Sequence, residues 1–448
     1  MPWNAVLDLV YLAIFIILLP WIAWRRWSGG RPVAAPWTRF TGDIPPLPAT
    51  DGRRRIWMHG VSVGEVQLLS SLATALRAPA EADVDVLEIV ASSSTTTGID
   101  LARRRFGGSA VFPCPLDFTW AVRRVFERVD PDLLVLGELE LWPHLLARAA
   151  ARGVPVVIAN ARLSPRSARG YARVRPLVER MLRTVTLISA RSDADAKRFL
   201  DLGGRDVVVA GSMKFDGVRG DRNAADVVRL AHLAGFRSED TVFLAGSTQS
   251  PEEHLAVEAF RAALPHHPSL RLVLVPRHVE RAAEVAALLD RAGVRWQSRS
   301  RLDADGADPQ ARVLLVDTTG ELGWWWGTAA VAFVGGSLDG KRGGQNMLEP
   351  AAYGAAVCFG PHTRNFADEV RVLQEADAAT VVADGRQLAS FLARCLDDPA
   401  WAAAQGARSA ATVTAHRGAT AATASRIHRL LALGRGITAG CRHAGTPQ

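Results

Sequence analysis

Cysteine is scarce in this sequence, which has four cysteines among 448 residues. They are widely scattered and show none of the paired spacings of a zinc site or a disulfide framework: Cys114, Cys358, Cys395 and Cys441. The sequence also lacks the lysine-containing loop of P-loop proteins and the strict G-x-G-x-x-G of dinucleotide-binding folds. These absences favour a reducing compartment and disfavour both ATP hydrolysis and hydride transfer.

The composition is that of a folded protein, with 48% hydrophobic and 22% charged residues. A chain of 448 residues is too long for one ordinary core, so we expect two domains of about 200 residues each. The net charge of +8 predicts an anionic partner. Nucleic acid, a membrane surface and a phosphorylated substrate all satisfy that condition.

The N-terminal residues 1–28 have the pattern of a membrane anchor. Residues 5–24 read "AVLDLVYLAIFIILLPWIAW" and are followed at once by Arg25 and Arg26. A cleaved signal peptide has its positive charge before the apolar run, so this order favours an anchor with the remaining chain in the cytoplasm. Asp8 and Pro20 weaken a full span, and a shallow position in the membrane interface is the alternative.

The rest of the chain divides by pattern into a Pro- and Gly-rich linker at 29–50, two domains at 51–215 and 216–433, and a tail at 434–448 that we expect to be disordered. Strands of the first domain are predicted at 56–59, 84–91, 133–136, 154–159, 187–190 and 207–210. Strands of the second are predicted at 242–245, 270–275, 294–297, 313–316, 330–334, 356–359 and 380–382. Because helical patterns alternate with these strands, we predict an α/β protein with two Rossmann-like domains.

Glu65 follows the first predicted strand, in the segment "HGVSVGEV". A carboxylate at the C-terminal end of a strand stands where open α/β sheets bind ligands. However, Ser62 and Glu65 also have the S-x-x-E spacing of a capping box, in which the glutamate satisfies helix N–H groups. Both interpretations fit this stretch.

Two further acidic residues follow a strand in "LLVLGELELWP". The alternation of a strand places Glu138 and Glu140 on one side and Leu139 on the other. Either acid can be functional, and either can cap the next helix or pair with an arginine. Lys214, in "GSMKFD" at the boundary between the domains, can neutralise developing negative charge or be an ordinary exposed lysine.

A block of arginines runs through residues 160–193. Its members are Arg162, Arg166, Arg169, Arg173, Arg175, Arg180, Arg183 and Arg191. Tyr171 is the one aromatic residue among them, which argues against stacked nucleic-acid bases. Beside a membrane anchor, such a block favours contact with anionic lipid headgroups, with a solvated helix face as the alternative.

The second half of the chain has residues suited to a nucleotide. Arg277 ends a strand and can hold a phosphate. Glycines in "FVGGSLDGKRGGQNMLE" allow close approach of the backbone to a ligand, and Glu349 can accept hydrogen bonds from ribose hydroxyls.

Ten motifs together, in this order, resemble the 3-deoxy-D-manno-octulosonic acid (Kdo) transferases of lipopolysaccharide assembly, from the anchor to about residue 430. They are "HGVSVGEV", "GELELWP", "ANARLSPRSARGY", "GSMKFD", "AGSTQSPEE", "VPRHVER", "DTTGEL", "AFVGGS", "GGQNMLEPAAYG" and "FGPHTRNF". The resemblance implies a GT-B fold, in which two Rossmann-like domains face each other across a cleft. It also implies inverting transfer of Kdo from CMP-Kdo to a lipid A precursor at the cytoplasmic face of the inner membrane, without a metal, another cofactor or nucleic acid.

The resemblance also implies roles for particular residues. Glu65 is the general base, a role that requires a carboxylate that no partner consumes, and Glu138 and Lys214 assist the transition state. The residues implied to hold CMP are Pro276, Arg277, Thr319, Gly320, Glu321, Asn346, Met347, Leu348 and Glu349. The sequence departs from the family's G-G-H-N-P-L-E at Gln345 and Met347, and its "STQSPEE" departs from the more common S-T-H-x-G-E-E, which puts details of donor contact in question. The linker at 29–50 lacks the family's basic, Trp-containing pattern apart from Trp37 and Arg39, which puts the identity of the acceptor in question.

Two other functions remain open at this point. One is a GT-B transferase or epimerase that uses a UDP-linked sugar, which a comparison of CMP with UDP binding distinguishes. The other is a membrane-tethered protein that binds anionic lipid or nucleic acid without catalysis, which predicts binding that weakens steeply with salt and ignores nucleotides.

Overall fold

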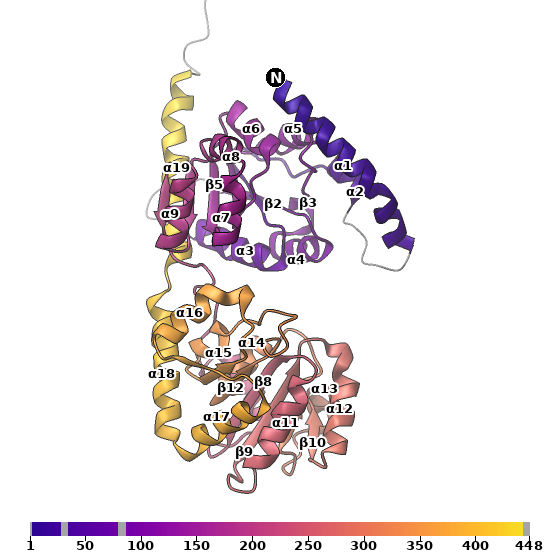
Figure 1. Ribbon diagram of the computed structural model, residues 1–448, viewed down its shortest axis with the longest axis vertical. Coiled ribbons are helices and arrows are strands. Elements are labelled where there is room, and N and C mark those ends of the chain that lie inside the picture. Colours follow the sequence, from indigo (N-terminus) through magenta and orange to yellow (C-terminus); the bar gives the residue numbers. More distant parts are fainter. Residues whose placement is uncertain (1, 28–34, 79–86, 442–448) are drawn as a thin grey trace, which may run out of the picture. The chain divides into compact units, whose positions relative to one another are not determined.

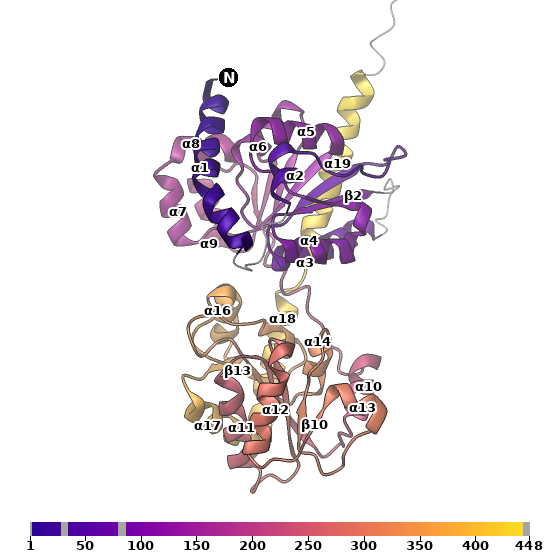
Figure 2. The same ribbon diagram turned by 90° about the vertical axis from the view of Figure 1, so that its right-hand side faces the viewer.

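The computed structural model describes residues 2–27, 35–78 and 87–441. The chain forms two compact units, one made of Met1–Gly217 with Arg417–Gln448 and the other of Val218–His416. Each unit contains a seven-stranded parallel sheet with helices on both faces (Figures 1 and 2). We call them unit 1 and unit 2.

The sheet of unit 1 has the order β3-β2-β1-β4-β5-β6-β7, and every pairing is parallel. Its strands are β1 (Arg55–His59), β2 (Glu88–Ser93), β3 (Val111–Pro113), β4 (Leu133–Gly137), β5 (Val156–Ala161), β6 (Leu187–Ala190) and β7 (Val207–Val209). The apolar runs predicted these strands except β3, and residues 84–86 of the second predicted strand lie outside the described residues. The order reverses direction between β1 and β4, which makes this pair the switch point of the sheet.

Alternate residues of β1 enter two different cores. Ile56 and Met58 pack with residues of α3 and α19, whereas Trp57 packs with residues of α5, α6 and α8. Successive side chains of a strand point to opposite faces of the sheet, and both faces are buried at β1, so neighbouring residues enter different cores. The helices of unit 1 that cover the sheet are α3 (Val63–Arg77), α4 (Thr96–Phe106), α5 (Thr119–Val129), α6 (Pro143–Ala151), α7 (Pro165–Ala172), α8 (Arg175–Leu182), α9 (Asp193–Asp201) and α19 (Ala419–Cys441).

The last helix, α19, belongs to unit 1 although the sequence pattern groups residues 417–433 with the second domain. Ile427 and Leu431 enter the core that Leu69 and Leu72 of α3 form. The helix also continues to Cys441, so the first part of the tail expected to be disordered is helical.

The N-terminal segment forms helix α1 (Pro2–Trp27), and the expected linker contains a short helix, α2 (Pro36–Thr41). Asp8 of α1 accepts hydrogen bonds from the backbone N and the Oγ1 of Thr119 at 3.0 and 2.5 Å, and so caps the start of α5. Tyr11 packs edge-on against Phe118. Among the described residues, no helix combines the length and the apolar character that a membrane span requires.

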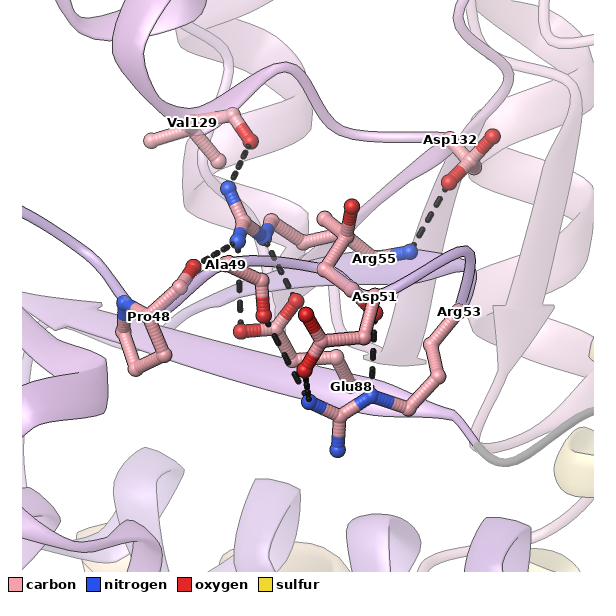
Figure 3. A network of polar contacts seen from close by, with 9 residues as sticks. Pro48, Ala49, Asp51, Arg53, Arg55, Glu88, Val129 and Asp132 are labelled. Atoms are coloured by element: carbon pink, nitrogen blue, oxygen red, sulfur yellow. Dashed lines mark hydrogen bonds and ion pairs between the residues drawn. The ribbon is translucent and has the colours of Figure 1, made fainter.

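A buried ion pair ties β1 to β2 at the ends of these strands that are remote from the switch-point loops (Figure 3). Arg55 Nε and Nη2 lie 2.9 and 3.2 Å from the two carboxylate oxygens of Glu88. The remaining donors of this guanidinium bond the carbonyls of Val129 and Pro48 (Figure 3). Because each of the three guanidinium nitrogens has a partner and Glu88 carries the opposite charge, the buried charge is compensated.

The sheet of unit 2 has the order β10-β11-β9-β8-β12-β13-β14 and is also parallel. Its strands are β8 (Thr241–Thr248), β9 (Leu270–Pro276), β10 (Trp296–Ser298), β11 (Val313–Leu315), β12 (Val331–Val334), β13 (Ala356–Phe359) and β14 (Ala379–Val381). Its helices are α10 (Ala225–Leu233), α11 (Glu252–Ala263), α12 (Ala282–Arg291), α13 (Arg299–Asp305), α14 (Leu322–Trp325), α15 (Leu348–Ala352), α16 (Ala367–Glu375), α17 (Gly385–Asp397) and α18 (Pro399–Ala415). Its switch point lies between β8 and β12.

Candidate active site

The switch point of unit 1 brings Glu65, in the first turn of α3, close to Glu138, in the turn after β4. β1 and β4 pair in parallel, with His59 opposite Leu136, so the chain leaves both strands at the same edge of the sheet. A Cβ atom placed on Gly137 would lie 3.5 Å from Glu65 Oε2. The carboxylate of Glu65 is therefore beside the residue that precedes Glu138.

The Glu65 carboxylate accepts hydrogen bonds from two donors. Ser62 Oγ lies 2.7 Å from Glu65 Oε1, and the backbone N of Val61 lies 2.9 Å from Glu65 Oε2. Ser62 is also the N-cap of α3, because its Oγ accepts from the backbone N of Glu65. The capping alternative is thus present, and the expectation of a carboxylate without partners is wrong. Each carboxylate oxygen keeps a second acceptor position, so capping leaves room for base chemistry.

Glu138 does not continue the strand. β4 ends at Gly137, and Glu138 has a left-handed backbone with φ of 54°. Strand alternation therefore cannot place Glu138 and Glu140 on one side, and this part of the sequence prediction is wrong. Beyond the turn, Leu139 and Leu141 pack against the core while Glu140 accepts from Trp142 Nε1 at 2.6 Å.

Burial and like charge shift the pKa values of the acids at this edge. Burial raises the pKa of Glu65, the hydrogen bonds from Val61 and Ser62 oppose that shift, and the charge of Glu138 adds to it. Burial also raises the pKa of Glu140 to about 7; the bond from Trp142 opposes this shift, while Glu65 and Glu138 increase it. A carboxylate with a raised pKa is a better proton acceptor near neutral pH.

The segment that carries Lys214 reaches the same place. Glu65, Glu138, Asn160 and Met213 line one small pocket of unit 1. The backbone N of Met213 donates to Asn160 Oδ1 at 2.9 Å. Lys214, the next residue, is half-buried. All three residues expected to carry the chemistry are thus on unit 1, at or next to one pocket.

In unit 2, Arg277, Asn346 and Glu349 come together. Arg277 is exposed directly after β9, which ends at the buried Pro276. Asn346 Nδ2 donates to Glu349 Oε1 at 3.1 Å. Burial raises the pKa of Glu349, whereas the hydrogen bond from Asn346 and the charges of Arg219 and Arg277 lower it.

Sequence analysis missed Arg219 because it stands in a polar stretch near the domain boundary without a motif. Its guanidinium carbon lies 3.8 Å from the ring centroid of Trp324. Arg219 therefore adds a second positive charge near Glu349. No local pattern predicts this neighbour, because some 130 residues separate the two in the chain.

The side chains of some other residues expected to hold CMP are buried or already bonded to neighbouring residues. Met347 and Leu348 are fully buried, so they can offer a ligand only their main chain. The carboxylate of Glu321 accepts two bonds of 2.9 Å from Arg299 and a third of 2.9 Å from Thr318 Oγ1. Thr319 and Gly320 are exposed in the preceding turn.

The two motifs that depart from the family pattern meet at one point of unit 2. A Cβ atom placed on Gly336 would lie 3.3 Å from Gln345 Nε2 and 3.4 Å from Gln249 Nε2. Gln249 stands in "STQSPEE" and Gln345 in "GGQNMLE". The departures are therefore a single local change around the glycine loop after β12.

The chain is similar to known proteins over most of its length. Residues 37–217 match the family described as 3-deoxy-D-manno-octulosonic-acid transferase (kdotransferase). A 3-deoxy-D-manno-octulosonic acid transferase of Bordetella pertussis is 34% identical over 424 residues, which cover 92% of this chain and 95% of that protein. One of Haemophilus influenzae is 35% identical over 323 residues, which cover 71% of this chain and 74% of that protein.

Solved structures agree on the fold. UDP-GlcNAc 2-epimerase from Neisseria meningitidis, bound to UDP-GlcNAc, aligns with a TM-score of 0.55 over 85% of this chain and all of that one, at 11% identity. Together with the two parallel sheets, this likeness gives a GT-B α/β fold. The identity and coverage of the relative from Bordetella pertussis show that the chain belongs to the 3-deoxy-D-manno-octulosonic acid transferase family.

Proposed function

We propose that this protein transfers Kdo from CMP-Kdo to a lipid A precursor, with inversion at the anomeric carbon. The observation that carries the proposal is the pair Glu65 and Glu138 at the switch point of unit 1, in a chain related over 92% of its length to a Kdo transferase. Ligands of open α/β sheets bind at such a switch point.

The chemistry requires one base and one stabilised leaving group. A sugar hydroxyl of the acceptor attacks the anomeric carbon of Kdo while Glu65 takes its proton. The bond from that carbon to the phosphate oxygen of CMP breaks, and CMP leaves with the electron pair. A single displacement of this kind inverts the anomeric centre. Glu138 and Lys214 stabilise the charges that develop.

Unit 2 holds the nucleotide in this proposal. Arg277 and Arg219 offer positive charge to the phosphate of CMP, and Glu349 accepts hydrogen bonds from the ribose hydroxyls. Asn346 orients Glu349 through its 3.1 Å bond. The turn of Thr319 and Gly320 and the main chain at Met347 complete the contacts. The positive side chains take the place of a metal ion.

We further propose that unit 1 works on the cytoplasmic surface of the inner membrane. Helix α1 exposes a run of apolar side chains: Val6, Leu9, Val10, Ile14, Ile16, Ile17 and Leu18. The helices α7 and α8, with the turn between them, expose Arg166, Arg169, Arg173 and Arg175. An apolar helix that lies in the interface and basic residues that meet anionic headgroups would keep the enzyme near a lipid-linked acceptor.

The direct test is a reaction of the purified full chain with CMP-Kdo and a tetra-acylated lipid A precursor, with the products resolved by mass. The proposal expects a lipid product heavier by Kdo and one CMP released for each Kdo transferred. Unchanged lipid, or transfer from a UDP-linked sugar in place of CMP-Kdo, would contradict it.

A further inference from the structure

The strand next to β4 contains a residue that the proposed mechanism does not use. Asn160 lies in β5 with 2% of its surface exposed and a left-handed backbone, with φ of 55°. The pairing of β5 with β6 shifts register between Ile158 and Ala161, around this residue. Such irregularities in strands often re-aim a side chain next to an active site. Asparagine is among the few residue types other than glycine that tolerate this conformation.

One hydrogen bond fixes the orientation of the side-chain amide of Asn160. Met213 donates its backbone N–H to Asn160 at 2.9 Å, and only the Oδ1 atom can accept it. The Nδ2 group therefore points elsewhere, and this buried donor has no hydrogen-bond partner among the residues that the structure describes. Buried donors are rarely left unpaired, so this one calls for an acceptor.

The pocket around Asn160 limits what that acceptor can be. The pocket has no room for a water molecule. Its other lining residues are apolar apart from two carboxylates, those of Glu65 and Glu138. Each oxygen of Glu65 already has one donor, Val61 or Ser62. Glu138 is next to Asn160 through the main chain, because its backbone N donates to the carbonyl of Ala159 at 2.9 Å. A buried donor without a partner thus lines the same pocket as the half-buried carboxylate of Glu138.

We propose that Asn160 is a positioning residue for this reaction: its Oδ1 holds the main chain just before Lys214, and its Nδ2 donates to the Glu138 carboxylate in the working enzyme. Forming this bond requires a movement of the half-buried Glu138 side chain within the pocket that both residues line. Asn160 then links the two residues expected to stabilise the transition state, without touching the substrate. The inference rests on the proposed function, because it assigns a partner to Glu138 in that reaction.

Two substitutions separate this role from a structural one. Asn160→Asp keeps the acceptor for Met213 but replaces the donor by an oxygen, which places another negative charge beside Glu65 and Glu138. We expect kcat to fall and the acidic limb of the pH–rate profile to move to higher pH, because the added charge raises the pKa of the base. Asn223→Asp, at an exposed position of unit 2, adds the same charge as the control and should leave the profile unchanged.

Asn160→Gly removes the whole side chain at a backbone angle that glycine adopts freely, so it covers the case in which the Asp variant does not fold. We expect a loss of kcat of roughly tenfold in the wild-type background and little further loss in a Glu138→Ala background, which lacks the acceptor. The KM for CMP-Kdo should stay the same in each comparison.

Equal losses in both backgrounds would overturn the inference, because Asn160 would then act independently of Glu138. An Asn160→Asp protein with the wild-type rate and pH profile would overturn it as well. Both results presuppose that the wild-type protein transfers Kdo. If the wild-type protein does not, the proposed function has failed, and that outcome is distinct from a failure of the inference.

Discussion

Ser62 Oγ lies 2.7 Å from Glu65 Oε1 and donates to it, while the same oxygen atom of Ser62 accepts from the backbone N of Glu65. Glu65 therefore has two roles: it takes part in the cap of α3, and it places a carboxylate at the switch point of unit 1. The bonds from Ser62 and Val61 hold its side chain, and Glu65 lines a pocket together with Glu138.

Ser62→Ala tests this double role through pH. The loss of the hydroxyl removes a bond that lowers the pKa of Glu65, so that pKa rises. Because the base must be ionised, the acidic limb of the profile of kcat/KM against pH should move to higher pH. Loss of the N-cap should also lower the free energy of unfolding by about 1 kcal/mol.

Ser192→Ala is the matched control for this prediction. Ser192 caps α9 in the same way, accepting from the backbone N of Asp195 and donating to its carboxylate at 2.9 Å. Ser192→Ala should lower the free energy of unfolding by a similar amount, and the profile of kcat/KM against pH should stay unchanged. A Ser62→Ala enzyme with an unshifted acidic limb would show that Glu65 is not the titrating base.

Arg55→Met tests the buried ion pair of unit 1. The substitution leaves the Glu88 carboxylate buried without its partner (Figure 3), so the free energy of unfolding should fall by about 3–5 kcal/mol. Urea unfolding followed by circular dichroism measures the change. Arg103→Met breaks an exposed pair with Asp100 and should change stability by less than about 1 kcal/mol. Equal effects of the two variants would contradict the account.

Nucleotide binding tests unit 2. CMP at about 100 times its Kd should stabilise the protein by roughly 2.7 kcal/mol, and UDP at the same concentration should not. Arg277→Ala should weaken the thermal shift with CMP, whereas Arg291→Ala, at the exposed end of α12, should leave it unchanged. A larger shift with UDP would favour a different nucleotide sugar.

Membrane association is tested with vesicles. The full chain should sediment with vesicles that contain anionic phosphatidylglycerol, and less so as salt rises, because charge contributes to binding. Ile17→Glu on α1 should weaken sedimentation, since Ile17 is 74% exposed on the apolar run. Leu200→Glu, 52% exposed on α9, is the control. If neither Ile17→Glu nor added salt weakens binding to the vesicles, the proposed surface is wrong.

Local sequence patterns predicted the strands and the place of Glu65 and Glu138 at strand ends, because apolar runs bounded by turns are local signals. They missed β3, which is only Val111–Pro113 and sits among prolines. They also missed that α19 packs on α3, since an amphipathic pattern does not say which sheet a helix covers. The left-handed turn at Glu138 and the bond from Met213 to Asn160 depend on contacts between distant segments, which no short motif encodes.

The most direct test of the central claim is the rate of Glu65→Gln beside its binding of CMP. The amide cannot take a proton from the acceptor hydroxyl, so kcat should fall by roughly 10²–10⁴-fold. The thermal shift with CMP should equal that of the wild type, and unfolding should change by no more than the loss of a cap, about 1 kcal/mol. A folded Glu65→Gln protein that transfers Kdo at the wild-type rate would show that Glu65 only caps a helix.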